Sequence, residues 1–232
     1  MSDRGRQPYL IAAAMLAVAI AAAVGLVAGY QVADDDSATF PAEDSVDAGF
    51  ARDMSVHHAQ AVEMSLIVRD NTDDDAVRTI AYDIATTQQQ QIGQMYAWLD
   101  LWQLPQHSSE PAMAWMRDGT GGHDMTNMAA ETEPTETGGL MPGMATSEEM
   151  DQLRAARGQP AEILFLQLMI RHHLGGIEMA EYAMEHADVE QVRDLAETMV
   201  LAQESEVDAM NDLLVERGAE PIERLDQSER RR

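Results

Sequence analysis

Two short segments of this chain place methionine sulfur and histidine nitrogen at the same spacing. Each reads Met-x-x-His-His, with another Met six residues after the second His. Since each helical residue advances by about 100°, the four side chains of one copy share a sector of about 120° on a helix. Thioether is a ligand for soft Cu(I), and imidazole serves both copper oxidation states. The candidate ligands are Met54, His57, His58 and Met64 in the first copy, and Met169, His172, His173 and Met179 in the second.

The competing interpretation is structural, because methionine at helical spacing more often fills a core than binds a metal. Comparison of the two copies weakens this interpretation. Packing positions change between them, as where Ile84 corresponds to Met199 and Trp98 to Leu213. The Met, His, His and Met positions do not change, although packing alone would tolerate Leu or Ile in place of Met.

A further group of Met and His residues lies between the two copies. This segment holds three Met-x-x-Met pairs and two histidines among Gly and Pro residues, namely Met113, Met116, Met125, Met128, Met141, Met144, His107 and His123. We expect these methionines to be exposed, because a segment rich in Gly and Pro has no core of its own to fill. Exposed thioethers would strengthen the copper interpretation.

The spacing of residues in the sequence excludes other classes of metal or catalytic site. No Glu has a His three residues later, which excludes the carboxylate di-iron pattern, and the motifs of zinc proteases, serine hydrolases and phosphate-binding loops are missing. Asp73–Asp75 lacks the Gly and distal Glu of a calcium loop and is interpreted as a solvated helix start. Glu63 falls on the far side of the helix from Met54, so we do not count it as a ligand.

Composition limits the partners. The 232 residues carry a net charge of −26, which makes nucleic acid a poor partner and favours cations. The chain has no Cys, and this excludes disulfides, thiolate metal sites and cysteine nucleophiles.

An internal repeat predicts the elements that position these side chains. At an offset of 115 residues, Phe50–Leu99 aligns without gaps with Phe165–Leu214, and thirteen of the fifty positions are identical. Apolar residues recur in each copy at three-and-four spacing, so each copy predicts a helical hairpin. Two hairpins with one apolar stripe each can bury those stripes only against each other, which predicts an all-α four-helix bundle.

Capping and breaking residues predict where the helices begin and end. Ser45 caps the first helix, which stops at Asn71, and Asp73–Asp75 begins the second, which ends before Pro105. Pro160 begins the third helix and Gly218 ends the fourth. The predicted organisation of this domain, residues 45–218, is a hairpin at 45–102, a loop at 103–146, a short helix at 147–157 capped by Ser147, and a hairpin at 160–217.

The N-terminus reads as a membrane anchor. Residues 10–28 carry no charge and are long enough to cross a hydrocarbon core of about 30 Å. Arg4 and Arg6 precede them, which predicts a single-pass protein of the cell membrane with a cytoplasmic N-terminus and an extracytoplasmic domain. A cleaved signal, giving a secreted protein, is the alternative. We assign 1–33 to the anchor or uncleaved signal, 34–44 to an acidic linker and 219–232 to a charged tail.

The segments FARDMSVHHAQAVEMS (50–65), GHDM (122–125), MPGM (141–144) and FLQLMIRHHLGGIEMA (165–180) resemble the ferritin-like family DUF305 over roughly residues 45–218. This resemblance implies a ferritin-like four-helix bundle that binds copper through Met and His. Gly175–Gly176 departs from the family pattern, which suggests a close helix approach or a loosened site. The ligands implied position by position are Met54, His57, His58, Met64, His123, Met125, Met128, Met141, Met144, Met169, His172, His173 and Met179.

These observations lead to one leading hypothesis of function and two alternatives. The leading hypothesis is a non-catalytic, extracytoplasmic copper-binding protein that sequesters or transfers Cu(I) or Cu(II) in copper tolerance. A structural or interaction bundle and a Cu(I) oxidase stay open. The partners that go with the leading hypothesis are copper ions, the membrane, a copper-donor or acceptor protein, and a second copy of the chain.

Overall fold

The computed structural model describes residues 40–116 and 140–222, and within these ranges every regular element is a helix. This confirms the all-α prediction. The elements are α2 (Val46–Asn71), α3 (Asp75–Leu101), the short 3₁₀ helix η2 (Ala114–Met116), α5 (Ser147–Ala155), α6 (Gln159–His186) and α7 (Glu190–Glu216).

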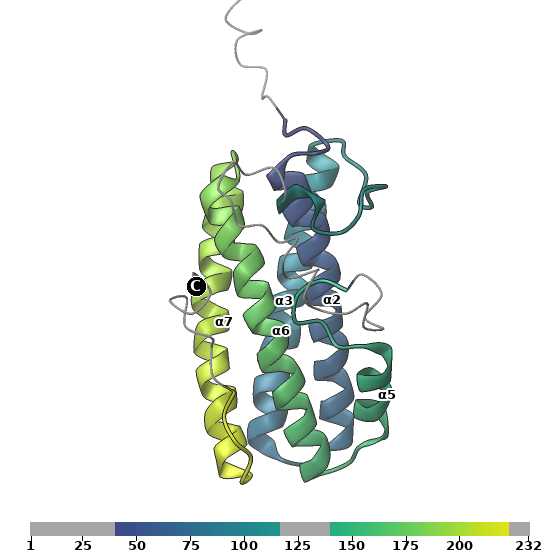
Figure 1. Ribbon diagram of the computed structural model, residues 1–232, viewed down its shortest axis with the longest axis vertical. Coiled ribbons are helices and arrows are strands. Elements are labelled where there is room, and N and C mark those ends of the chain that lie inside the picture. Colours follow the sequence, from purple (N-terminus) through teal and green to yellow (C-terminus); the bar gives the residue numbers. More distant parts are fainter. Residues whose placement is uncertain (1–39, 117–139, 223–232) are drawn as a thin grey trace, which may run out of the picture. The chain divides into compact units, whose positions relative to one another are not determined.

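The four long helices form two antiparallel hairpins that pack together. Helices α2 and α3 make the first hairpin and α6 and α7 the second, each joined by a three-residue connection. Between the hairpins the main contact runs along α2 and α6, whereas α3 and α7 meet at few positions (Figure 1). Helix α5 lies against α2 and α6, and η2 contacts α2. The residues of both Met-x-x-His-His copies therefore lie on the two helices that join the halves of the bundle.

Side-chain caps explain where the helices begin. Ser45 accepts a hydrogen bond from the Ala48 backbone N–H, as predicted, and Asp74 accepts one from Val77 at the start of α3. The prediction that Ser147 caps the short helix is wrong. The cap is Thr146, which forms a reciprocal capping box with Glu149. The helix begins at residue 147, as predicted, and ends at Ala155, two residues before the predicted end.

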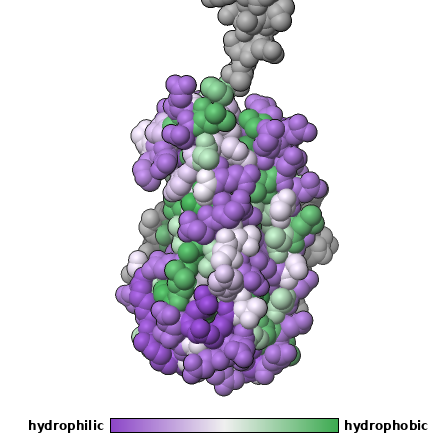
Figure 2. All heavy atoms as spheres, turned by 180° about the vertical axis from the view of Figure 1, so that it is seen from behind, coloured by the Kyte–Doolittle hydropathy of each residue, from purple (hydrophilic) through white to green (hydrophobic). Residues whose placement is uncertain are grey.

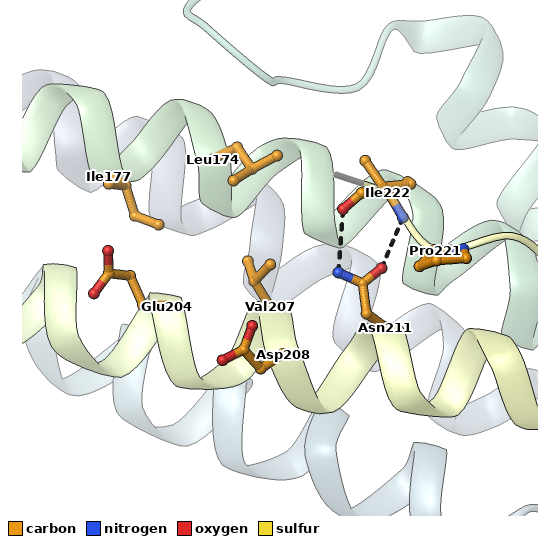
Figure 3. A pocket seen from close by; sticks show the side chains of 8 residues that line it. All are labelled: Leu174, Ile177, Glu204, Val207, Asp208, Asn211, Pro221 and Ile222. Carbon is orange, nitrogen blue, oxygen red and sulfur yellow. Dashed lines mark hydrogen bonds between the residues drawn. The ribbon is translucent and has the colours of Figure 1, made fainter. Parts of the chain in front are cut away.

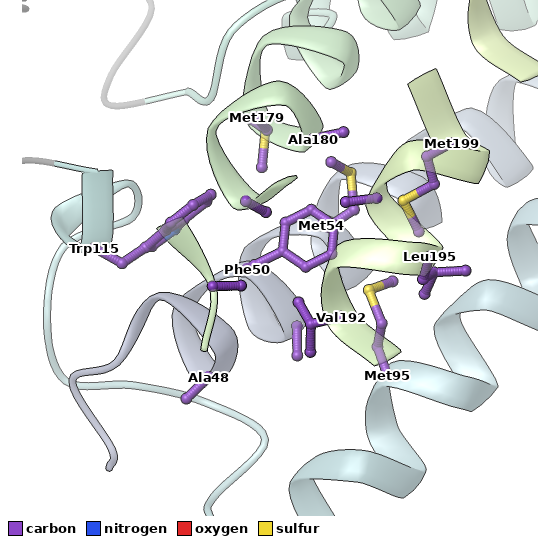
Figure 4. Close-up of a cluster of buried hydrophobic side chains, with 14 of the residues drawn as sticks. Ala48, Phe50, Met54, Met95, Trp115, Met179, Ala180, Val192, Leu195 and Met199 are labelled. Carbon is purple, nitrogen blue, oxygen red and sulfur yellow. The ribbon is translucent and has the colours of Figure 1, made fainter. Parts of the chain in front are cut away.

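The apolar core is divided into two clusters along the bundle. The first contains Phe50, which packs edge-on against Trp115 at 6.1 Å between ring centroids and lies among Met95 and Met199 (Figure 4). The second is built around Phe165, the residue equivalent to Phe50 in the other repeat. On each long helix, one or more buried polar residues lie between the positions that belong to the two clusters.

The surface of the bundle is mainly hydrophilic. Figure 2 shows polar and charged residues over most of one face, with apolar residues in scattered groups. None of the helices within the described ranges is long and apolar enough to cross a membrane. The predicted anchor at residues 10–28 lies outside those ranges, so it stays a prediction.

Candidate metal centre

A layer of buried polar side chains crosses the middle of the bundle between the two apolar clusters. We call it the polar layer, and its members are His57, His58, Gln88, Gln91, His172, His173, Gln203 and Glu206. All but Glu206 are at most 5% exposed. Burying polar groups is costly unless they are hydrogen-bonded or hold an ion, so the partners of these side chains decide what the layer does.

The four histidines of the two repeats lie together in this layer. The rings of His57 and His172, which occupy equivalent positions in the repeat, face each other with 3.7 Å between centroids and an interplanar angle of 32°. The centroid of His173 lies 6.4 Å from that of His172. The sequence repeat therefore becomes a spatial pairing, in which equivalent imidazoles meet at the interface between the hairpins.

Each histidine uses its Nε2 atom in a hydrogen bond to an acceptor oxygen. His57 donates to the Pro142 carbonyl and His172 to the His57 carbonyl, both at 3.0 Å. Since a carbonyl only accepts, these two Nε2 atoms carry the proton. His58 contacts the Gln91 Oε1 at 2.8 Å, and His173 contacts a Glu206 carboxylate oxygen at 2.7 Å.

Three of the four opposite ring nitrogens have no hydrogen-bond partner. The Nδ1 atoms of His57, His58 and His173 are buried and have no hydrogen-bond partner. With the proton on Nε2, each of these atoms presents a lone pair to the interior. Metal-binding imidazoles have the same arrangement: one ring nitrogen donates a hydrogen bond to an oxygen, and the other nitrogen binds the ion.

Burial keeps these rings neutral. Loss of water lowers the pKa of His57 to about 4 and that of His58 to about 3, and in His58 the neighbouring His57 lowers it further. Burial also lowers the pKa of His172 well below its usual value, with the other three histidines adding to the effect. A neutral imidazole is the form that binds a metal, so the ligands need not lose a proton at neutral pH.

Sequence reasoning missed the glutamines of the layer. Gln88 and Gln203 are equivalent in the repeat, and the Oε1 atom of each is buried without a partner. A Cβ atom added to Gly176 would lie 2.7 Å from the Gln203 Oε1 and 3.3 Å from the His57 Cε1, so this glycine leaves room for the amide beside the ring. The identity of positions 88 and 203 was the sequence signal that could have found them.

The four helical methionines lie on either side of the polar layer. Met54 and Met179 belong to the first apolar cluster, and Met64 and Met169 to the second. All four are fully buried. Antiparallel packing of α2 and α6 thus pairs the start of one motif with the end of the other, which puts one thioether pair above the histidines and one below them.

The expected exposure of the loop methionines is wrong where the structure describes them. Met141 is 6% exposed and belongs to the first apolar cluster, and Met113, Met116 and Met144 are partly buried against the same cluster. Met141 fills the core and the other three pack against it, so methionines in this Gly- and Pro-rich segment are no independent sign of metal binding. The remaining predicted ligands of this segment, His123, Met125 and Met128, lie outside the described residues.

The segment 141–145 covers the histidines along α2 and α6. The Pro142 carbonyl accepts from His57, and Gln60 exchanges two hydrogen bonds with the backbone of Ala145. Any Cβ at Gly175 would overlap the Pro142 carbonyl. The glycine at position 175, which departs from the family pattern, therefore allows α6 and this covering segment to approach closely.

Glu206 is the one carboxylate among the residues of the polar layer. Within the described ranges, no three His, Asp or Glu side chains are arranged to hold a metal ion by themselves. A site here therefore needs a ligand of another kind, such as a methionine sulfur or a glutamine oxygen. Glu63 is half exposed and pairs with Arg154, in agreement with its exclusion as a ligand.

An open cavity elsewhere on the bundle is separate from these residues. It measures about 610 Å³, lies along α6 and α7, and is closed at one side by two hydrogen bonds between the Asn211 side chain and the Ile222 backbone (Figure 3). None of the predicted ligands lines it. The metal hypothesis therefore concerns the interior of the bundle and not this surface hollow.

Solved structures share this fold. A DUF305 protein from Streptomyces coelicolor is 51% identical, and the match covers 79% of this chain and all of the other, with a TM-score of 0.67. A DUF305 fragment from Deinococcus radiodurans is 27% identical over 74% of this chain and 96% of its own, with a TM-score of 0.58. No curated protein matches the chain.

CopM has a similar fold at low identity. Its Cu(I)-bound form is 18% identical, with a TM-score of 0.53 over 73% of this chain and 96% of CopM. Its Cu(II)-bound form is 20% identical, with a TM-score of 0.52 over 74% and 97%. The profile of the domain of unknown function DUF305 matches residues 47–214, which contain the whole polar layer. The chain therefore belongs to the DUF305 family.

Proposed function

We propose that this protein binds copper in the polar layer and sequesters it or passes it on. The observation that carries the proposal is the set of buried, unpartnered Nδ1 atoms of His57, His58 and His173. An unpaired buried acceptor costs about 1–3 kcal/mol. A copper ion held by one or two of these nitrogens, together with a ligand of another kind, would remove that cost at the atoms it binds.

The surrounding donors favour copper over harder ions. Fully buried thioethers flank the histidines on both sides, and the chain offers no thiolate as a competing soft ligand. Thioether with imidazole suits Cu(I), and imidazole also accepts Cu(II). The fold likeness to CopM, a protein solved in Cu(I)-bound and Cu(II)-bound forms, supports the choice of metal.

The proposal extends to the setting of the domain. We propose a ferritin-like bundle that residues 10–28 hold outside the cell membrane. The net charge of the chain, −26, attracts cations there. Its role there is copper tolerance, with a copper-donor or acceptor protein, or a second copy of the chain, as partner. The proposal includes no catalytic step.

The test is a Cu(I) titration of the full-length chain in competition with a chromophoric chelator. We expect the wild type to withdraw copper from the chelator, and the double variant His57→Ala, His172→Ala to bind less while keeping its helical circular dichroism. His107→Ala, which changes an exposed histidine, is the matched control and should bind as the wild type does. A wild-type chain that never competes for copper would refute the proposal.

One observation favours a second candidate, a purely structural bundle. Every histidine Nε2 of the polar layer already has a partner, and the flanking methionines fill apolar clusters. For such a bundle, copper titrations would be flat and each His→Ala variant would lose stability. The same titration and an unfolding curve for each variant distinguish the two candidates.

A further inference from the structure

The two repeats differ in the residue that orients the second histidine of each motif. At the offset of 115 residues, Gln91 of α3 corresponds to Glu206 of α7. The contacts are otherwise the same, since His58 meets the Gln91 Oε1 at 2.8 Å and His173 meets the Glu206 Oε2 at 2.7 Å. One repeat therefore orients its histidine with a neutral amide, and the other does so with a carboxylate.

The charge of Glu206 is little compensated by its surroundings. No arginine of the described residues forms an ion pair with it, and the ring of His173 is the only group there with which it forms a salt bridge. Its side chain is 22% exposed, whereas the ring that it contacts is fully buried. The carboxylate thus acts on the interior through one imidazole.

We infer that Glu206 makes the two halves of the centre unequal, so that the His173 half prefers Cu(II) and the His58 half prefers Cu(I). This inference rests on the proposed function. A carboxylate behind an imidazole makes the ring a stronger donor to the metal. It also attracts a divalent ion with twice the Coulomb energy of a monovalent ion at the same place. Gln91 orients its ring equally well but adds no charge.

The proposed role of Glu206 is that of a positioning residue, because it acts through His173. Comparison of the two repeats suggests the substitution that tests this role. Glu206→Gln gives the second repeat the residue that the first already carries, so the layer has a native precedent for accommodating it. Gln91→Glu makes the reciprocal change, and Glu197→Gln removes one exposed charge from the same helix as Glu206 and serves as the control.

The experiment measures the Cu(I) and Cu(II) affinities of the full-length chain by chelator competition, together with the Cu(II) electron paramagnetic resonance spectrum. For Glu206→Gln we expect a loss of about 10–100-fold in Cu(II) affinity, the range typical of such supporting residues. Because the Coulomb energy scales with ionic charge, the loss in Cu(I) affinity should be the square root of this factor, about 3–10-fold. The Cu(II) electron paramagnetic resonance spectrum of Glu206→Gln should also differ from that of the wild type.

The reciprocal variant and the control complete the test. Gln91→Glu should raise Cu(II) affinity relative to Cu(I), and Glu197→Gln should leave both unchanged. Equal losses for the two ions in Glu206→Gln, or no loss, would overturn the inference while wild-type copper binding still upheld the proposed function. A wild type that binds neither ion would overturn both.

Discussion

Acidification should destabilise the metal-free protein through its buried histidines. The pKa of His57 is about 4 and that of His58 about 3 in the folded chain, against 6.5 for an exposed histidine. Between these values the unfolded chain binds protons that the folded chain does not. Stability therefore rises with pH across this window, and it is lost as the pH falls below 6.5.

The size of the effect follows from the depth of burial. At pH 5 both rings are still neutral in the folded state, so each contributes a loss of about 2 kcal/mol, taken as 1.5 pH units at about 1.4 kcal/mol per unit. Together they cost about 4 kcal/mol, a large part of the roughly 5–15 kcal/mol that stabilises a typical domain. Both rings are fully buried, so solvent screening does not reduce these figures.

The assay compares two chains so that other titrating groups cancel. Urea unfolding of metal-free wild type and His58→Gln at pH 7.5 and pH 5 gives the loss of stability for each chain. The wild type should lose about 2 kcal/mol more than the variant, because the variant has one buried imidazole fewer. His107→Gln, at an exposed position, should behave as the wild type. Equal losses in wild type and His58→Gln would refute the reasoning.

Three further substitutions test how the bundle packs. Gly175→Ala should cost about 1–3 kcal/mol and raise hydrogen exchange in 141–145, because its Cβ would displace the Pro142 carbonyl from His57. Gly93→Ala, at an exposed helical glycine without neighbours, should instead stabilise by up to about 1 kcal/mol. Phe50→Ala should cost about 3–5 kcal/mol in urea unfolding, because it empties the centre of the first apolar cluster.

Two results would contradict these packing predictions. A Gly175→Ala chain as stable as the wild type would show that the covering segment does not need this close approach. A Phe50→Ala loss below about 1 kcal/mol would mean that the first cluster closes around the missing ring, contrary to a well-packed core.

Local residue patterns were sufficient to predict the helices. Ser45 and Pro160 mark helix starts because capping and first-turn preferences act over three or four residues. Gly218 follows the last helix at a positive φ of 76°, which glycine adopts at little cost. The repeat then required two equivalent hairpins, and two apolar stripes required their pairing. The side on which the motif histidines lie also followed from helical periodicity.

The roles of individual atoms depended on contacts far apart in the chain. His57 is oriented by Pro142, 85 residues away, and His172 by the His57 carbonyl, 115 residues away. No local spacing encodes such contacts, and the loop methionines were misjudged for the same reason, since their core is supplied by the helices. Periodicity assigns a residue to a face of its helix. Only the packing of α2 against α6 decides which oxygen that residue meets, and which ring nitrogens stay free for a metal.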